Sequence, residues 1–413
     1  DSLYVNTGEL YNKLSGLLKR TSVDISGNQQ IKNLEPLSEL SDLTDLNCSN
    51  TVVINLFPVR NLNRLEVLDV SNAPVDDLSA LSYSTSLKSL DCSYTLLVDL
   101  TAISGLYNLE KLACAGLRIN SAEFTRGMPS LQDLNLSETQ IYNLSDLSGL
   151  KSLEELDVSG TGIQELEPVK EFTSLKYLNA EETSISRLDP LSGLQQLAVL
   201  KISYTAVEDL QPLNDLPNLK RIYWDSNGNF TVDKKKKRQQ AITFMNTHPG
   251  SLVIFESEEL MSSWSDLEEP WKEIARNAVD LSENPTKEEL HALLQLEEIR
   301  IENTPVTTLD PVARLYNLKK LSIPGLQVND YSPVGGAIEL EYLDLSNTSV
   351  GALDFVIHLN HLTELNIEGT KVSDLSPLEN LETLKYVYAD GTSVDDADVI
   401  ALREKNPACV VLY

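Results

Sequence analysis

The residues that could do acid–base or metal chemistry are few and scattered. The chain has four histidines, at His248, His291, His358 and His361. His358 and His361 are three residues apart, but no cysteine or glutamate accompanies them in a metal-ligand spacing. The sequence contains no glycine-rich phosphate loop, no G-x-S-x-G and no H-E-x-x-H. It therefore predicts no active site, no metal site and no cofactor, and we expect a protein that is not an enzyme.

Acidic and amide residues recur at intervals of 22 residues. The series reads Asn47, Asp69, Asp91, Ala113, Asn135, Asp157 and Asn179. One interpretation is a cation site, since Ca²⁺ prefers several oxygen ligands. The interpretation we favour is that these side chains bond to one another and to the serine two residues further on.

The positions of the cysteines indicate that they are core residues. Cys48, Cys92 and Cys114 share one position of the same 22-residue period, which other repeats fill with Val, Leu, Ile or Ala. We expect buried, free thiols, because directly stacked parallel strands suit disulfide geometry poorly. Four cysteines neither demand nor exclude an oxidising compartment.

Tyrosine and basic residues gather where a partner could be recognised, and Tyr and Arg are enriched at binding hot spots. The candidate binding residues are Tyr177, Lys201, Tyr204, Arg221 and Tyr223 in the first part of the chain, and Arg300, Lys320, Tyr342, Tyr386 and Tyr388 in the second. The structural alternative is that tyrosines are common on exposed sheets and pack across neighbouring strands.

A 22-residue repeat must position these side chains. Leucines recur at this step in nine starts from Leu43 to Leu219, and again from Leu296 to Leu384. One unit is LEELDVSGTGIQELEPVKEFTS, at 153–174. A period in the twenties with L-x-x-L-x-L is a leucine-rich-repeat signature.

The repeat predicts its own local structure. Positions 3 to 7 alternate polar and apolar residues, which predicts a short strand with one buried face. A single coil cannot bury its apolar residues, so we expect stacked coils with parallel strands on the concave side. Proline at position 16 discourages regular structure on the convex side. Threonine at position 9 can satisfy backbone groups that the turn leaves unpaired.

The full pattern, L-x-x-L-x-L-x-x-T-x-I-x-x-L-x-P-L-x-x-L, resembles the 22-residue leucine-rich repeats of bacterial internalins over roughly 43–226 and 296–394. It departs at position 9, where internalins usually carry Asn. The resemblance implies an α/β repeat solenoid, a right-handed superhelix with a parallel concave sheet and little convex helix. It also implies a bacterial protein, secreted or at the cell surface. It assigns no role to individual concave residues.

Two tandem arrays with short helical caps are expected, at 1–256 and 257–413, with about eleven and about seven rungs. A helical cap is predicted within 1–22, and matching turn–helix–strand caps at 233–255 and at the C-terminus. The basic run from Lys234 to Arg238 is interpreted as a solvated helix face. Trp264 and Trp271 are interpreted mainly as capping the second array.

The net charge of the chain restricts the kinds of partner that we expect. The 413 residues carry a net charge of −29 and have a pI near 4.4, which argues against nucleic acid or anionic lipid. No apolar run approaches the ~18 residues of a membrane span. The chain starts at Asp1, so we expect a mature or trimmed chain whose signal peptide or anchor lies outside it. We expect a monomer.

Three function hypotheses follow. The favoured one is a non-enzymatic module that binds a protein, or a glycan, through its concave surfaces. The second is a scaffold or spacer, in which neither face is special. The third is an intracellular regulator similar to the phosphatase-binding leucine-rich-repeat proteins, which would keep its thiols reduced.

Overall fold

The computed structural model describes residue 16 and residues 19–226, 233–302 and 304–413. They divide into two compact units, one within 1–244 and 248–255, the other within 245–247 and 256–413. Nearly all of the helix predicted within 1–22 lies outside the described residues. The predicted division at residues 256 and 257 stays a prediction.

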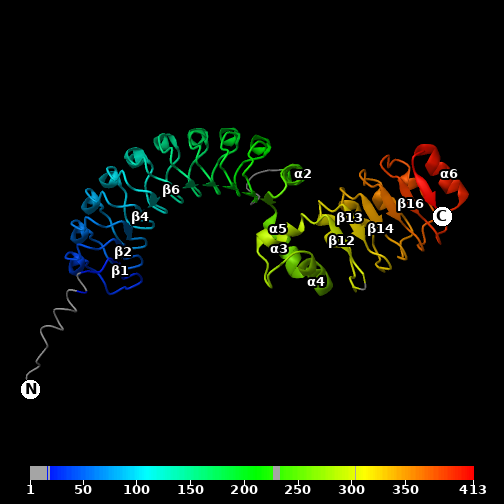
Figure 1. Ribbon diagram of the computed structural model, residues 1–413, viewed down its shortest axis with the longest axis horizontal. Coiled ribbons are helices and arrows are strands. Elements are labelled where there is room, and N and C mark those ends of the chain that lie inside the picture. The colour runs from blue at the N-terminus through cyan, green and yellow to red at the C-terminus, as the bar shows by residue number, and fades with distance from the viewer. Residues whose placement is uncertain (1–15, 17–18, 227–232, 303) are drawn as a thin grey trace, which may run out of the picture. The chain divides into compact units, whose positions relative to one another are not determined.

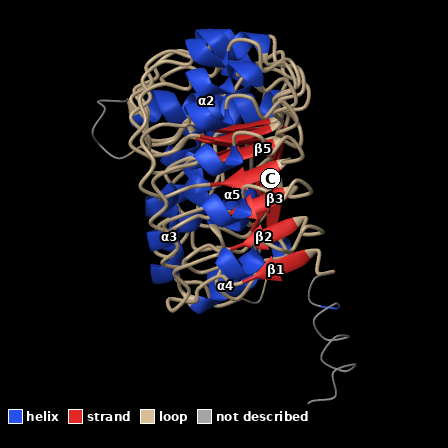
Figure 2. Ribbon diagram, turned by 90° about the vertical axis from the view of Figure 1, so that its left-hand side faces the viewer, coloured by secondary structure: helices blue, strands red, loops and turns tan. Residues whose placement is uncertain are grey.

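The first unit is one parallel sheet whose eleven strands follow chain order. The strands are β1 (Ser22–Asp24), β2 (Asp45–Asn47), β3 (Val67–Asp69), β4 (Ser89–Asp91), β5 (Lys111–Ala113), β6 (Asp133–Asn135), β7 (Glu155–Asp157), β8 (Tyr177–Asn179), β9 (Val199–Lys201), β10 (Arg221–Tyr223) and β11 (Leu252–Ile254). Their register is one repeat per rung, so that Leu156 pairs with Leu178. Figure 1 shows these strands along the inner side of a curved array, and Figure 2 shows the first of them stacked as a ladder.

The second unit is a parallel sheet of six strands, again in chain order. They are β12 (Glu298–Arg300), β13 (Lys320–Ser322), β14 (Tyr342–Asp344), β15 (Glu364–Asn366), β16 (Tyr386–Tyr388) and β17 (Val410–Leu412). The expectation of about seven rungs was wrong. The segment from Val279, which resembles the start of the first array, forms no strand. Helix α5 occupies seven of the residues between it and β12, and a helical residue advances only about 1.5 Å, so no full coil fits.

Short 3₁₀ segments fill the return side of most coils, which confirms the prediction of little convex helix. They are η1 (Glu35–Leu37), η2 (Phe57–Val59), η3 (Ser79–Leu81), η4 (Thr101–Ile103), η5 (Glu123–Gly127), η6 (Ser145–Leu147), η7 (Glu167–Glu171), η8 (Asp189–Leu191), η9 (Gln211–Leu213), η10 (Asp310–Arg314), η11 (Ser332–Gly336), η12 (Asp354–Val356) and η13 (Ser376–Leu378). Proline occupies an early position in many of them, including η8 and η9, where its fixed φ fits a helical turn. The five-residue η5 follows Ala122, a buried alanine at a position where the regular repeats carry leucine.

Within residues 19–226, 233–302 and 304–413, five α-helices belong to the caps. They are α2 (Lys234–Thr247), α3 (Ser257–Asp266), α4 (Glu269–Ala278), α5 (Lys287–Leu293) and α6 (Asp396–Lys405). Asp233 caps α2 by accepting the N–H groups of Lys235 and Lys236. The basic run was interpreted as a solvated helix face, and Lys234, Lys235 and Lys236 are exposed. Lys237 is instead buried, with its ammonium 4.6 Å from the ring centroid of Trp224, and Arg238 is half-buried.

The core is a column of leucines and other aliphatic residues from every rung. Leu153, Leu156, Val158 and Ile163 are each fully buried, and the same positions are buried in neighbouring repeats. In the second unit Trp271 joins this core, and its indole N–H donates to the carbonyl oxygen of Thr308 at 2.8 Å. The prediction that Trp271 caps the second array is thus confirmed. Among the described residues, none of the helices is long and apolar enough to cross a membrane.

Candidate functional site

The first candidate site lies at the end of the first sheet, on β8, β9 and β10. The ammonium of Lys201 lies 5.5 Å from the ring centroid of Tyr177 and 5.3 Å from that of Tyr223. These are cation–π distances. The three side chains come from adjacent strands at outward positions, so the register of the sheet brings them together.

The cluster is partly desolvated. Burial raises the pKa of the Tyr177 hydroxyl, and the nearby Lys201 charge only partly offsets this. Tyr223 is 9% exposed, whereas Tyr177 and Lys201 are half-buried. We call these three residues the Tyr–Lys–Tyr cluster. Tyr177 and Lys201 are its accessible part.

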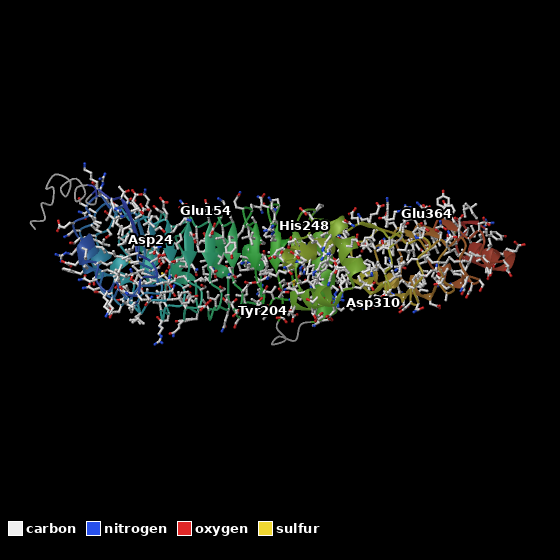
Figure 3. All side chains as sticks on the ribbon, turned by 90° about the horizontal axis from the view of Figure 1, so that it is seen from below. Asp24, Glu154, Tyr204, His248, Asp310 and Glu364 are labelled. Carbon is white, nitrogen blue, oxygen red and sulfur yellow. The ribbon has the colours of Figure 1, made fainter. Side chains whose placement is uncertain are left out.

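Two other predicted residues of the first unit are not among these three. Arg221 is exposed at the start of β10. Tyr204, predicted on the concave face, lies three residues past the end of β9 with a φ of 63°. In Figure 3 Tyr204 lies at the opposite edge of the ribbon from Glu154. The repeat imposes this left-handed turn residue, and strand propensity alone gives no sign of it.

The second candidate site lies on the sheet of the second unit. Arg300, Lys320 and Tyr386 are exposed, and Tyr342 and Tyr388 are half-buried. Burial raises the pKa of Tyr342, as do the carboxylates of Asp344 and Glu364, while Arg300 lowers it. Arg300 forms an ion pair with Glu302. Basic, acidic and aromatic groups therefore occur together on β12 to β16.

The Asp and Asn side chains at the fifth repeat position form hydrogen bonds within the turns that follow their own strands. Asp157 accepts from the backbone N–H of Ser159 at 2.9 Å and from its hydroxyl at 2.6 Å. The other carboxylate oxygen of Asp157 accepts from the amide of Asn179 at 2.9 Å. Asn47 and Asn135 bond to their serines in the same way. The predicted hydrogen bonds are thus present, and within the described ranges no group of three or more His, Cys, Asp or Glu residues could hold a metal ion.

The cysteines are buried thiols. Cys48, Cys92, Cys114 and Cys409 are all free, and the Cys92 and Cys114 sulfurs are 3.7 Å apart. Burial, followed by the charge of Asp69, raises the pKa of Cys48 to about 12. A thiol with this pKa is a poor nucleophile at neutral pH.

A family comparison supports the repeat assignment. The family model described as "Leucine Rich repeats (2 copies)" matches residues 338–380. Together with the stacked parallel strands, this match shows a leucine-rich repeat fold. A comparison with curated proteins gives no match.

Among solved structures, one shows the same fold. A leucine-rich repeat protein of Leptospira interrogans is 18% identical, with 98% of each chain covered and a TM-score of 0.53. An internalin of Listeria monocytogenes, inlF, is 16% identical over 96% of this chain and 88% of that chain, with a TM-score of 0.44. A second Listeria internalin, inlC2, is 27% identical over 48% of this chain and 78% of that one, with a TM-score of 0.38. The leucine-rich repeat fold predicted from the sequence is confirmed.

Proposed function

We propose that this leucine-rich repeat protein is a non-enzymatic binding module that holds a protein partner on its concave sheets. We further propose a bacterial, extracellular or cell-surface setting, supported by the resemblance of its repeats to those of internalins. Leucine-rich repeat solenoids generally act as binding scaffolds, so the fold favours this class. The argument for a site must come from residues.

The Tyr–Lys–Tyr cluster carries the proposal. In most rungs the fifth repeat position holds Asp or Asn, which accepts a hydrogen bond from the turn that follows. The ammonium of Lys201 at that position cannot accept such a bond. Turn formation therefore does not explain this lysine, nor its place between two tyrosine rings. Aromatic and cationic side chains that are already packed together cost little entropy to order in a complex.

The test is a pull-down from cell-surface and host extracts with wild type and a Tyr177→Ala/Lys201→Ala variant. Tyr223 is left intact because it is nearly buried. The matched control is Tyr83→Ala/Tyr142→Ala, whose tyrosines are 88% and 66% exposed and lie outside the strands. We expect the concave variant to weaken capture by about 30-fold, a hot-spot loss of about 2 kcal/mol, and the control to bind as wild type.

A second concave variant, Tyr386→Ala/Arg300→Ala, separates the two sheets. A partner lost only from this variant places the site on the second unit. A partner retained by both concave variants contradicts the proposal, and capture of no partner favours the spacer hypothesis. Treating the extract with glycosidases distinguishes a glycan ligand from a protein ligand.

A further inference from the structure

A pocket lies in the N-terminal cap of the second unit. It has a volume of about 520 Å³ and is formed by α3, α5 and η10. Pockets of this size commonly hold small ligands. No residue in its lining belongs to the two concave sites.

The pocket exposes apolar side chains that a cap would ordinarily bury. Leu260, Trp264 and Leu267 lie on one face of α3 and its C-terminal extension, at the spacing of successive helical turns. All three line the pocket and remain half-buried, as does Leu293 of α5. Covering these side chains would stabilise a complex by the hydrophobic effect.

The rim of the pocket is predominantly acidic. Asp266, Glu268 and Asp310 line it, against the single cation Arg314. Glu268 is already occupied, because its two oxygens accept from the N–H and hydroxyl of Thr307 at 2.8 and 2.7 Å. Asp266 and Asp310 are exposed, and Figure 3 labels Asp310. An excess of carboxylates around an apolar floor complements a positive charge.

We propose that this pocket binds a small cationic amphiphile. The apolar chain of the ligand lies against Trp264 and the leucines, and its amine faces Asp266 and Asp310. This inference is independent of the concave binding surfaces, because it uses none of their residues.

The experiment is isothermal titration calorimetry of the full chain with dodecylammonium, dodecanol and dodecanoate, each below its critical micelle concentration. We expect dodecylammonium to bind at one site, about tenfold more tightly than dodecanol, as one charge-assisted contact allows. Dodecanoate should bind most weakly. No binding by any of the three probes overturns the proposal, as does tightest binding by dodecanoate.

Matched variants locate the site. Leu260→Arg should abolish binding, whereas Met261→Arg, on the same helix at a residue that is 40% exposed and not in the lining, should bind as wild type. Equal binding by these two variants overturns the location.

Asp266→Asn/Asp310→Asn changes only exposed side chains, so it stays informative even if Leu260→Arg fails to fold. The double variant should bind dodecanol as wild type does but should no longer bind dodecylammonium more tightly than dodecanol. An unchanged preference overturns the assigned role of the two carboxylates.

Discussion

At the scale of single residues, one hydroxyl recurs where the strands turn. Thr161 Oγ1 donates to the carbonyl oxygen of Val158 at 2.6 Å, and Thr161 is only 7% exposed. The same bond recurs at Thr51, Thr95, Thr139, Thr183, Thr205, Thr348, Thr370 and Thr392. This confirms the role predicted for the threonine at repeat position 9.

Replacing Thr161 with valine keeps the shape of the side chain and removes the donor. We predict that Thr161→Val lowers the free energy of unfolding by about 1 kcal/mol, because a buried carbonyl loses its partner. Urea titration followed by circular dichroism measures this. The control is Thr173→Val, the same change at an exposed threonine, which should stay within about 0.5 kcal/mol of wild type. Equal losses at both positions would contradict the account.

The backbone conformation of the residue just before the threonine at repeat position 9 was harder to predict. Asn50, Tyr94, Glu138, Glu182 and Tyr204 all adopt positive φ, a conformation that side chains other than Gly and Asn rarely take. The repeat enforces it whatever residue is present. Tyr94 even extends over Gly116, where a Cβ would meet its ring at 2.4 Å, and its hydroxyl donates to Glu138 at 3.1 Å. Only the three-dimensional stacking of rungs reveals such contacts.

At the scale of elements, helix α5 begins with a reciprocal cap. The side chain of Thr286 accepts the N–H of Glu289, and Glu289 accepts the N–H of Thr286 at 2.6 Å and that of Ser282 at 3.0 Å. These backbone bonds, together with the hydroxyl of Ser282, hold the pKa of Glu289 below its ordinary value of 4.5.

A carboxylate with a lowered pKa stabilises the fold above its unfolded pKa and loses that contribution as pH falls through the folded value. We therefore predict that Glu289→Gln lowers the urea midpoint of the second unit near pH 7. The difference from wild type should shrink as pH falls from about 6 to about 3. Glu283→Gln, at an exposed neighbour, is the control at pH 7. A difference that grows on acidification would contradict this assignment.

The elements differ in how far the sequence predicts them. The period of 22 predicts each strand of the regular repeats, because buried leucines and the parallel register impose the same spacing. The helix and strand that close each array, α2 with β11 and α6 with β17, were also predicted. The absence of a strand after Val279 was not predicted. The residues there resemble a rung of the repeat, but helix α5 leaves no room for one.

At the scale of the whole molecule, the repeats explain the fold and leave the partner undetermined. The residues that define the repeat are buried, so they carry no information about what binds outside. The register pairs Lys201 directly with Tyr223, and it pairs Tyr177 with Val199, two residues before Lys201 on the same strand. Regular spacing therefore brings these side chains onto neighbouring strands of one face. The pocket of the second unit could not be predicted this way, since α3, α5 and η10 meet only through tertiary packing.

Photo-cross-linking tests the central claim most directly. A benzophenone amino acid replaces Tyr177 on the concave sheet, Tyr386 on the second sheet, or Tyr142 outside the strands, and each protein is irradiated in native extract. We predict that one protein is captured covalently from position 177 or 386 and that none is captured from 142. Adducts from position 142 alone, or no adduct from either concave position, would contradict a binding function for the sheets.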